Sequence, residues 1–220
     1  MIDRRAFTGG IVIAGASGLL GCSNAETERV TPDLSNSLAR TRAPSSEELA
    51  KEGPLGDRFL GSVNAPVTVY EYVSLTCPFS RKFHIETYPR FKKDYIDNGK
   101  ARLVVREFPI GRSAAAAAVV ARAAPKQQYF ELHEKFLVQQ KEWTAQEVRP
   151  DAIFELAHQV GMSREAFDAA MNNQLVNDGL VWVKQRGREL GVTGTPTFFG
   201  NGEKRRGALT YTELQQLISV

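Results

Sequence analysis

The chain has 220 residues, 42% of them hydrophobic, and a net charge of +3 at neutral pH. This size and composition fit one globular domain with a sizeable core, and they exclude a fibrous or wholly disordered chain. The small charge, with no basic patch interleaved with aromatic residues, argues against nucleic acid as a partner. The two cysteines are too few for a disulfide framework.

The first 21 residues are typical of a targeting segment. A pair of arginines at 4–5 precedes a short apolar run at 10–20, which is too short for an ordinary spanning helix. The arginine pair resembles a twin-arginine signal. The motif Leu19-Leu-Gly-Cys22 resembles a lipobox, which predicts that Cys22 becomes the lipidated first residue of the mature chain. The alternatives are cleavage nearby by an ordinary signal peptidase, and an N-terminal helix with two stray arginines.

Residues 22–57 are polar, hold three prolines and show little apolar periodicity, which predicts a flexible tether. Loss of residues 1–21 would lower the net charge by one, to +2. With Cys22 lipidated, Cys77 would be the only free thiol of an exported chain, and such a thiol usually pairs between molecules or is reactive. We therefore expect a periplasmic or extracytoplasmic protein that is anchored to the membrane through Cys22.

Cys77 follows a predicted strand and precedes a predicted helix. Residues 67–73 are rich in β-branched and aromatic side chains, which favours a strand. Residues 80–96 have apolar residues at helical spacing, and Pro89 should kink or split that helix near Tyr88. Pro78 suits the first helical position, so Cys77 should be the N-cap, where free N–H groups and the helix dipole favour a reactive thiolate. The alternative is that Cys77 is a small buried hydrophobic residue.

The remaining elements follow in chain order. We predict a second strand at 101–108, a helical region at 114–172, a long helix at 175–190, two short strands at 197–199 and 203–206, and a closing helix at 210–220. The sequence Gly200-Asn-Gly202 between the short strands favours a hairpin turn. Pro196 begins the first short strand, a position that suits a residue with no N–H to donate. If its peptide bond were cis, the backbone of Thr195 would be free to meet a ligand, although the sequence does not decide the isomer.

These features resemble the DsbA-like branch of the thioredoxin superfamily from about Leu60 to Val220. That family carries Cys-Pro-x-Cys after its first core strand, opposite a loop with Gly-x-Thr-Pro or Val-Pro. Here the motifs are Cys77-Pro-Phe-Ser80 and Gly194-Thr-Pro-Thr197, and residues 129–143 are similar to the family's helical insertion. The resemblance implies an α/β thioredoxin-like fold over residues 58–220, with an insertion at about 112–172. It also implies thiol–disulfide oxidoreductase activity without a cofactor.

Ser80 is the departure from the family pattern, because it replaces the second cysteine. A hydroxyl cannot resolve a mixed disulfide, so a self-contained dithiol cycle is excluded. Ser80 can instead donate a hydrogen bond to the Cys77 thiolate, and an external thiol, such as glutathione as co-substrate, would complete each exchange. The motif also resembles the Cys-Gly-Phe-Ser of monothiol glutaredoxins, although Pro78 and the surrounding residues fit the DsbA-like family better.

Further site residues follow from position and resemblance. Glu71 lies within an apolar strand, where burial favours a neutral carboxyl; in the family an acidic residue at the matching position helps to move the thiol's proton. An edge-facing Glu71 is the alternative. Pro78 and Phe79 should shape substrate access, with a core position for Phe79 as its alternative. Thr195 and Pro196 should present backbone to which a substrate peptide pairs as an added strand.

Three readings of function therefore stand. The favoured one is a one-thiol oxidoreductase that acts on protein thiols or disulfides together with an external thiol. The others are a redox-inactive peptide-binding or chaperone-like module on the same fold, and a glutathione-dependent transferase or isomerase. The three histidines, at 84, 133 and 158, have no metal-ligand spacing, so we expect no metal site and place them as surface or insertion polar groups. Trp143 should pack in the core.

Overall fold

The computed structural model describes residues 43–219, so the predicted targeting segment, Cys22 and the tether up to residue 42 lie outside the described residues. The strands are β1 Arg58–Leu60, β2 Val67–Val73, β3 Ala101–Glu107, β4 Thr197–Gly200 and β5 Glu203–Arg206. The helices of the thioredoxin-like part are α2 Ser46–Ala50, α3 Pro78–Glu86, α4 Tyr88–Phe91, the π-helical turn Lys92–Ile96, α10 Gln174–Glu189 and α11 Tyr211–Ile218. Between β3 and α10 lie α5 Arg112–Ala123, α6 Lys126–Val138, α7 Gln140–Trp143, α8 Pro150–His158 and α9 Arg164–Met171.

The five strands form one mixed sheet in the order β1-β3-β2-β4-β5. The central strand β2 runs parallel to β3 and antiparallel to β4. It is covered on both faces, which explains its nearly continuous apolar sequence. Glu71 pairs in register with Val105 of β3 and Phe198 of β4, so its side chain leaves the sheet on the same face as theirs.

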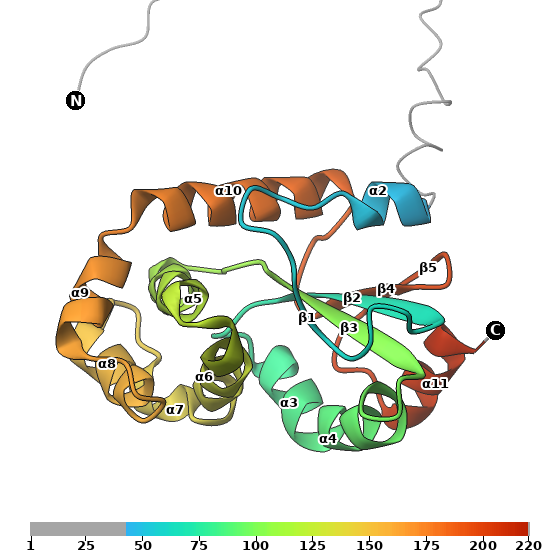
Figure 1. Cartoon of the computed structure of the whole chain (residues 1–220), viewed down its shortest axis with the longest axis horizontal. Coiled ribbons are helices and arrows are strands. Elements are labelled where there is room, and N and C mark those ends of the chain that lie inside the picture. The colour runs from blue at the N-terminus through green and yellow to red at the C-terminus, as the bar shows by residue number, and fades with distance from the viewer. Residues whose placement is uncertain (1–42, 220) are drawn as a thin grey trace, which may run out of the picture.

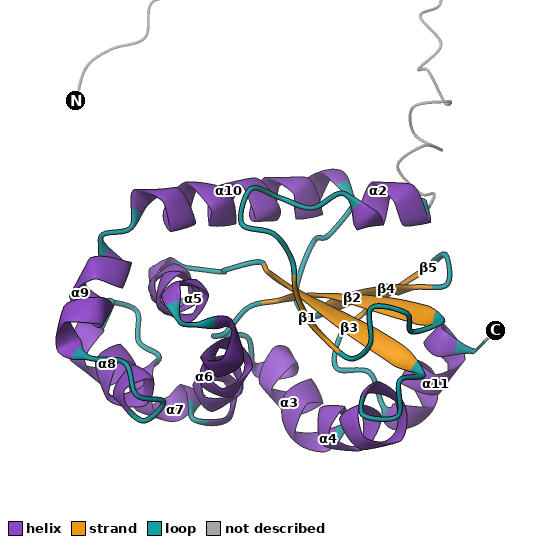
Figure 2. Cartoon of the chain, in the orientation of Figure 1, coloured by secondary structure: helices purple, strands orange, loops and turns teal. Residues whose placement is uncertain are grey.

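Helices cover the two faces of the sheet separately, as Figure 1 shows. Helices α10 and α2 lie over one face, and α3, α4 and α11 lie over the other (Figure 2). The α10 face buries Tyr70, Tyr72 and Phe199, whereas the α3 face buries Val69, Val73 and Phe198 with the larger core cluster. Helices α5 to α9 form a group at one side of the sheet.

Two predicted chain breaks appear where the sequence places them. Thr87 separates α3 from α4, and Pro89 lies in the first turn of α4, where its missing N–H costs no hydrogen bond. The hairpin between β4 and β5 turns at Asn201 and Gly202, with φ of 46° and 76°. A two-residue turn with positive φ at both positions matches the twist of antiparallel strands, and asparagine and glycine reach this region most easily.

The tether prediction is wrong for residues 43–57, because this segment is packed on the domain. Helix α2 begins with a capping box between Ser45 and Glu48, and Leu49 is buried. The guanidinium of Arg106 in β3, itself 3% exposed, donates to Asp57 at 2.8 and 2.9 Å and to the Leu49 carbonyl at 2.7 Å. A buried arginine therefore holds the segment at its middle and at its C-terminal end. Within residues 43–219, no helix is long and apolar enough to cross a membrane.

Candidate active site around Cys77

Cys77 is the N-cap of α3, with Pro78 in the first helical position. Its side chain is partly exposed, and its Sγ lies 3.0 Å from the carbonyl oxygen of Thr195, to which the thiol donates. The peptide bond between Thr195 and Pro196 is cis. The fold thus brings the two sequence motifs together across a gap of 118 residues.

The loop that carries Cys77 is held by hydrogen bonds from three parts of the chain. The Cys77 N–H donates to the Ser74 carbonyl at 3.0 Å. The buried amide of Gln140, in α7, donates to the carbonyls of Leu75 at 2.7 Å and Cys77 at 3.0 Å. The Thr76 hydroxyl donates to the Ile110 carbonyl at 3.1 Å. Gln140 was not predicted, since a single glutamine in a helical region gives no signal of a contact 63 residues away.

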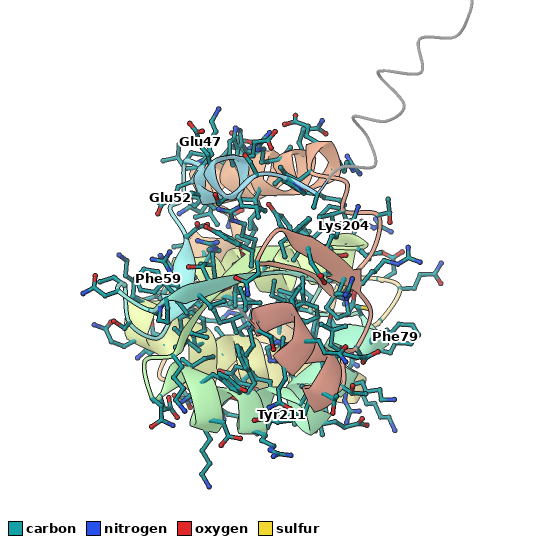
Figure 3. The ribbon with its side chains drawn as sticks, turned by 90° about the vertical axis from the view of Figure 1, so that its right-hand side faces the viewer. Glu47, Glu52, Phe59, Phe79, Lys204 and Tyr211 are labelled. Carbon is teal, nitrogen blue, oxygen red and sulfur yellow. The ribbon has the colours of Figure 1, made fainter. Side chains whose placement is uncertain are left out.

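The first turn of α3 directs its side chains in two directions. Pro78 and Phe79 are exposed, and Phe79, at 60% exposure, projects from the surface in Figure 3. Ser80 instead points into the protein and is fully buried. The expected hydrogen bond to Cys77 is absent, because the Ser80 hydroxyl has no hydrogen-bond partner among the described residues.

Glu71 is fully buried on β2, so the edge-facing alternative is wrong. Both of its carboxylate oxygens lie close to His84 Nε2, at 3.1 and 3.2 Å. His84 belongs to the buried side of α3 and is 4% exposed. The Nε2 atom of His84 thus faces the carboxylate, and the other ring nitrogen, Nδ1, has no hydrogen-bond partner among the described residues.

The placement of His84 as a surface or insertion polar group is therefore wrong. His133 does lie in the insertion, on α6, but it is buried, and His158 is exposed. His133 of α6 is 2% exposed, its ring centre lies 5.7 Å from that of His84, and its Nε2 has no hydrogen-bond partner within residues 43–219. Burial, with His84 and Arg122 nearby, holds the pKa of His133 well below its usual value. His133 is therefore a neutral ring behind the Glu71–His84 pair.

A second buried ionic group joins the insertion to the sheet. Arg122 of α5 and Glu107 of β3 form two hydrogen bonds of 2.6 and 2.8 Å, and the Tyr129 hydroxyl donates to the same carboxylate at 2.7 Å. All three side chains are buried. Trp143 is also buried, as predicted, and its indole N–H donates to the Phe136 carbonyl.

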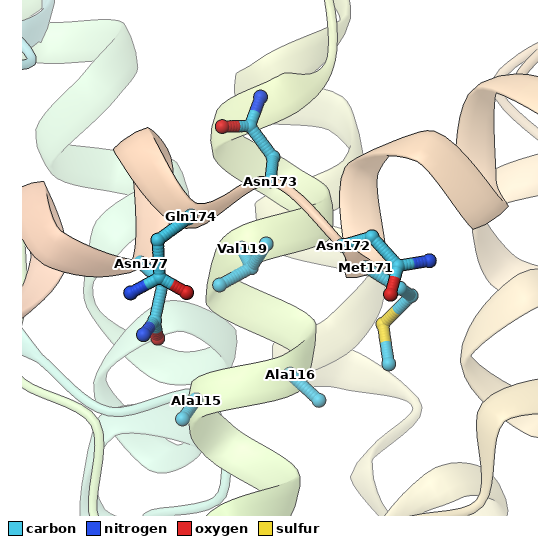
Figure 4. Close-up of a pocket in the computed structure, with 8 residues that line it drawn as sticks. All are labelled: Ala115, Ala116, Val119, Met171, Asn172, Asn173, Gln174 and Asn177. Atoms are coloured by element: carbon cyan, nitrogen blue, oxygen red, sulfur yellow. The ribbon is translucent and has the colours of Figure 1, made fainter.

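A hollow of about 340 Å³ lies apart from these residues, where α9 meets α10 beside α5. Figure 4 shows its lining, which combines small apolar groups with four amides: Ala115, Ala116, Val119, Met171, Asn172, Asn173, Gln174 and Asn177. It contains no thiol, carboxyl or imidazole group, and so it offers none of the chemistry found around Cys77.

Comparison with known proteins agrees with this geometry. The family model described as "Thioredoxin" matches residues 55–219. A Rickettsia conorii protein named "Putative protein-disulfide oxidoreductase" is 32% identical over 151 residues, which cover 66% of this chain and 53% of that protein. "Disulfide bond formation protein D" of Bacillus subtilis is 23% identical over 168 residues, covering 74% and 76% of the two chains. The chain spans about half the length of the Rickettsia relatives that it matches.

Solved structures extend the likeness to three dimensions. The crystal structure of alpha-DsbA1 from Wolbachia pipientis superposes with a TM-score of 0.71 at 26% identity, covering 78% of this chain and 93% of that one. BdbD from Bacillus subtilis, at 20% identity and a TM-score of 0.68, shows the same fold. With the family model matching from Leu55 to the end of α11, and with Cys77 facing the Thr195-Pro196 loop, the chain belongs to the thioredoxin family, in its DsbA-like branch.

Proposed function

We propose that this chain is a thiol–disulfide oxidoreductase that works through one nucleophilic thiol, Cys77. The observation that carries the proposal is the meeting of Cys77, at the start of α3, with the Thr195 carbonyl 3.0 Å away. Free N–H groups and the helix dipole at the start of a helix favour the thiolate. The names of the relatives, which refer to protein-disulfide oxidoreductases and disulfide bond formation, support the same chemistry.

The exchange proceeds in two balanced steps. The Cys77 thiolate attacks one sulfur of a substrate disulfide, forms a mixed disulfide and releases the other sulfur as a thiolate. Ser80 has no sulfur with which to resolve this intermediate. A second, external thiolate therefore attacks it, takes the substrate sulfur into a new disulfide and returns Cys77 as a thiolate. The substrate is a protein thiol or disulfide, and glutathione or another small thiol serves as the external partner, with no further cofactor.

Trapping the mixed disulfide tests this proposal. The full chain carrying Cys22→Ala, which leaves Cys77 as its one thiol, is incubated with a peptide disulfide and analysed by mass spectrometry. The mixed disulfide should persist until a small thiol is added, and Cys77→Ala should form none. Ser80→Cys should instead release product by closing an internal disulfide. If neither the Cys22→Ala chain nor its Ser80→Cys derivative forms an adduct, the peptide-binding module replaces the oxidoreductase.

We also propose that the protein acts outside the cytoplasm, attached to the membrane by lipid on Cys22. The support is the lipobox-like motif that ends at Cys22 and follows a short apolar segment. Cys22→Ala should release the exported protein from the membrane fraction or block its processing. A wild-type protein that is soluble after export, with its mature N-terminus beyond residue 22, would exclude the anchor.

A further inference from the structure

Positive side chains gather around Cys77. Four segments meet at the end of the sheet where this residue lies: 74–82, 108–115, 190–196 and 204–209. Together they contain lysines and arginines but no aspartate or glutamate. A surface with charge of one sign attracts ligands of the opposite sign and speeds their association. The charge around the thiol therefore bears on which molecules reach it.

Arg206 lies on the side of Cys77 that the cis-proline loop forms. It ends β5 and pairs in register with Thr197 at the start of β4, so it lies at the same end of the sheet as Thr195. Its guanidinium donates to the Thr193 hydroxyl at 3.2 Å. This bond leaves other N–H donors of the guanidinium free, and no carboxylate within residues 43–219 pairs with them.

Lys184 of α10 lies on another side of Cys77. Its ammonium group donates to the Pro109 carbonyl at 2.6 Å. The carbonyl of the next residue, Ile110, accepts from the hydroxyl of Thr76, the neighbour of Cys77. Lys184, like Arg206, forms no ion pair within the part of the chain that the structure describes. Two unpaired cations therefore lie near the thiol, one from α10 and one from β5.

Two further cations extend the positive surface away from the thiol. Lys204 is two residues before Arg206 on β5, on the same face of the sheet, and it donates to the Gly191 carbonyl at 3.2 Å. Arg188 is one helical turn after Lys184, and burial, with Arg188 nearby, lowers the pKa of Lys184. We call these four residues the cationic rim: Lys184, Arg188, Lys204 and Arg206.

We infer that the cationic rim selects client proteins in which carboxylates flank the reacting sulfur. The inference rests on the proposed function and adds the charge of its substrate. A client segment that lies extended beside Thr195 brings its cysteine to Cys77. Each extended residue advances by about 3.3 Å, so a client side chain two residues from that cysteine lies about 6–7 Å along the segment, close to Arg206 beside Thr193. A carboxylate there accepts from the free donors of the guanidinium.

An anionic membrane surface is the other partner that a group of cations would fit. The rim reaches the loops on two sides of Cys77, through Lys184 and Arg206. A membrane lying on it would therefore cover the partly exposed thiol and exclude the substrate. An acidic client segment uses the rim and the thiol together, which is why we assign the rim to clients.

Exchange rates with matched peptides test the inference. Each peptide holds one cysteine, as a mixed disulfide with mercaptoethanol, and carries either aspartate or asparagine two residues to each side. In the full chain with Cys22→Ala, the Cys77 thiolate attacks the peptide sulfur and releases the mercaptoethanol thiolate, and mass spectrometry follows the adduct. A small neutral thiol, thioglycerol, gives the intrinsic reactivity of each peptide. After this correction, the aspartate peptide should react about tenfold faster at about 0.01 M salt and equally fast at about 1 M salt.

Variants locate the preference. Lys184→Gln combined with Arg206→Gln keeps a donor at each position but removes two charges, so the preference should fall to about twofold or less. The matched control is Lys93→Gln combined with Lys100→Gln, two exposed residues before the start of β3, whereas Cys77 follows the end of the parallel strand β2. This control should keep the preference. Each ratio compares two peptides with one protein, so any change in the thiolate content of Cys77 cancels. Equal preferences in the two double variants, or no preference in the parent, would overturn the inference.

Binding without exchange separates this inference from the proposed function. Cys77→Ala is added to the Cys22→Ala chain, and fluorescence anisotropy measures its binding of the same two peptides. The aspartate peptide should bind more tightly at about 0.01 M salt and lose this advantage at about 1 M salt. If this difference persists while neither peptide forms an adduct with Cys77, the proposed function fails and the rim belongs to a peptide-binding module. Adducts that form at equal rates, with equal binding of the two peptides, leave the function intact and refute the inference. Binding of the parent to vesicles of phosphatidylserine and phosphatidylcholine, with no preference between the peptides, would also refute it.

Discussion

Gln140 is the residue through which the helical insertion contacts the loop that carries Cys77. Its single amide group pairs two backbone carbonyls, those of Leu75 and Cys77, on the loop that sets the start of α3. The Cys77 carbonyl also accepts from the backbone N–H of Arg81, at 3.0 Å. A side chain contributed by α7 thus completes the hydrogen bonding of an active-site loop that precedes the insertion in the sequence.

Replacing this amide should cost stability and loosen the loop. Gln140→Leu keeps the volume but removes the donor, so we expect a loss of about 1–3 kcal/mol in the free energy of unfolding. Urea unfolding measures this, and Gln127→Leu, an exposed glutamine in the neighbouring helix α6, is the matched control. Equal midpoints for the two variants would show that the carbonyls do not depend on Gln140.

His133 should make the folded state sensitive to acid. Its pKa is lowered by burial in the folded state and is about 6.5 in the unfolded chain. Below pH 6.5, His133 therefore binds a proton in the unfolded chain but stays neutral in the folded chain. The free energy of unfolding then falls as the pH falls.

His133→Phe removes this proton and also an unpartnered polar atom. Between pH 7 and pH 5 the variant should lose about 2 kcal/mol less of its unfolding free energy than the wild type. The exposed His158→Phe should behave like the wild type. If the unfolding free energy of His133→Phe falls with pH as much as that of the wild type over this range, the expectation is wrong.

At the scale of elements, the ion pair of Glu107 and Arg122 joins β3 to α5, and Tyr129 adds α6 to the same group. The guanidinium and carboxylate are each 1% exposed, so neither is screened by solvent. Removing one partner would leave the other charge buried and unpaired, which is the costly way to break such a pair.

Arg122→Met should therefore cost about 3–5 kcal/mol in unfolding free energy. Adding Glu107→Leu should restore a large part of it, because the stranded charge is gone. On the same helix, Arg112 pairs with Glu147 at 2.7 Å, but both side chains are more than 70% exposed, so Arg112→Met should change stability little. Thermal or urea unfolding of the wild type, Arg122→Met, Arg122→Met with Glu107→Leu, and Arg112→Met measures these differences. Equal losses of stability in Arg112→Met and Arg122→Met would contradict the prediction.

The elements that the sequence predicts well are those with strong local signals. Strand β2, the Cys77-Pro78 helix start and the Asn201-Gly202 turn each depend on residues adjacent in the chain. Strand β1 was missed because three residues are too few to show alternation. Helix α2 was missed although Ser45 and Glu48 have the spacing of a capping box, because one short turn carries little apolar periodicity.

Within the site, the sequence likewise predicts residues with local signals and misses contacts that form only between packed elements. Cys77, Thr195 and Glu71 could be placed from motifs and from their strand positions. The burial of His84 could not, because its partner lies on a strand thirteen residues earlier and the pair exists only once α3 packs on the sheet. Ser80 was expected to face Cys77, but the packing of α3 turns its hydroxyl into the protein.

At the scale of the whole molecule, the segment 43–57 belongs to the folded domain. Arg106 is buried, and its hydrogen-bond acceptors include Asp57, the Tyr72 hydroxyl and the carbonyl of Leu49. The segment also packs Leu49 into the core cluster beneath α10. The structural boundary of the domain therefore precedes the one that composition suggests.

Truncation should reveal this boundary. Chains that begin at residue 22 or at residue 43 both keep Leu49 and Asp57, so they serve as the references. A chain that begins at residue 58 loses Leu49 and Asp57 and leaves the Arg106 guanidinium with the Tyr72 hydroxyl alone among these acceptors, which should cost several kcal/mol by the usual penalty for a stranded buried charge. If the chain that begins at 58 is as stable as the others, the segment is dispensable.

Strand β5 ends the sheet beside β4, and its four residues are all exposed and charged: Glu203, Lys204, Arg205 and Arg206. An open sheet edge offers unpaired N–H and C=O groups to any extended chain, and closely spaced charges are a known protection against such pairing. The charged edge should therefore disfavour pairing of β5 with a second extended chain, so the sheet is not expected to extend beyond this strand.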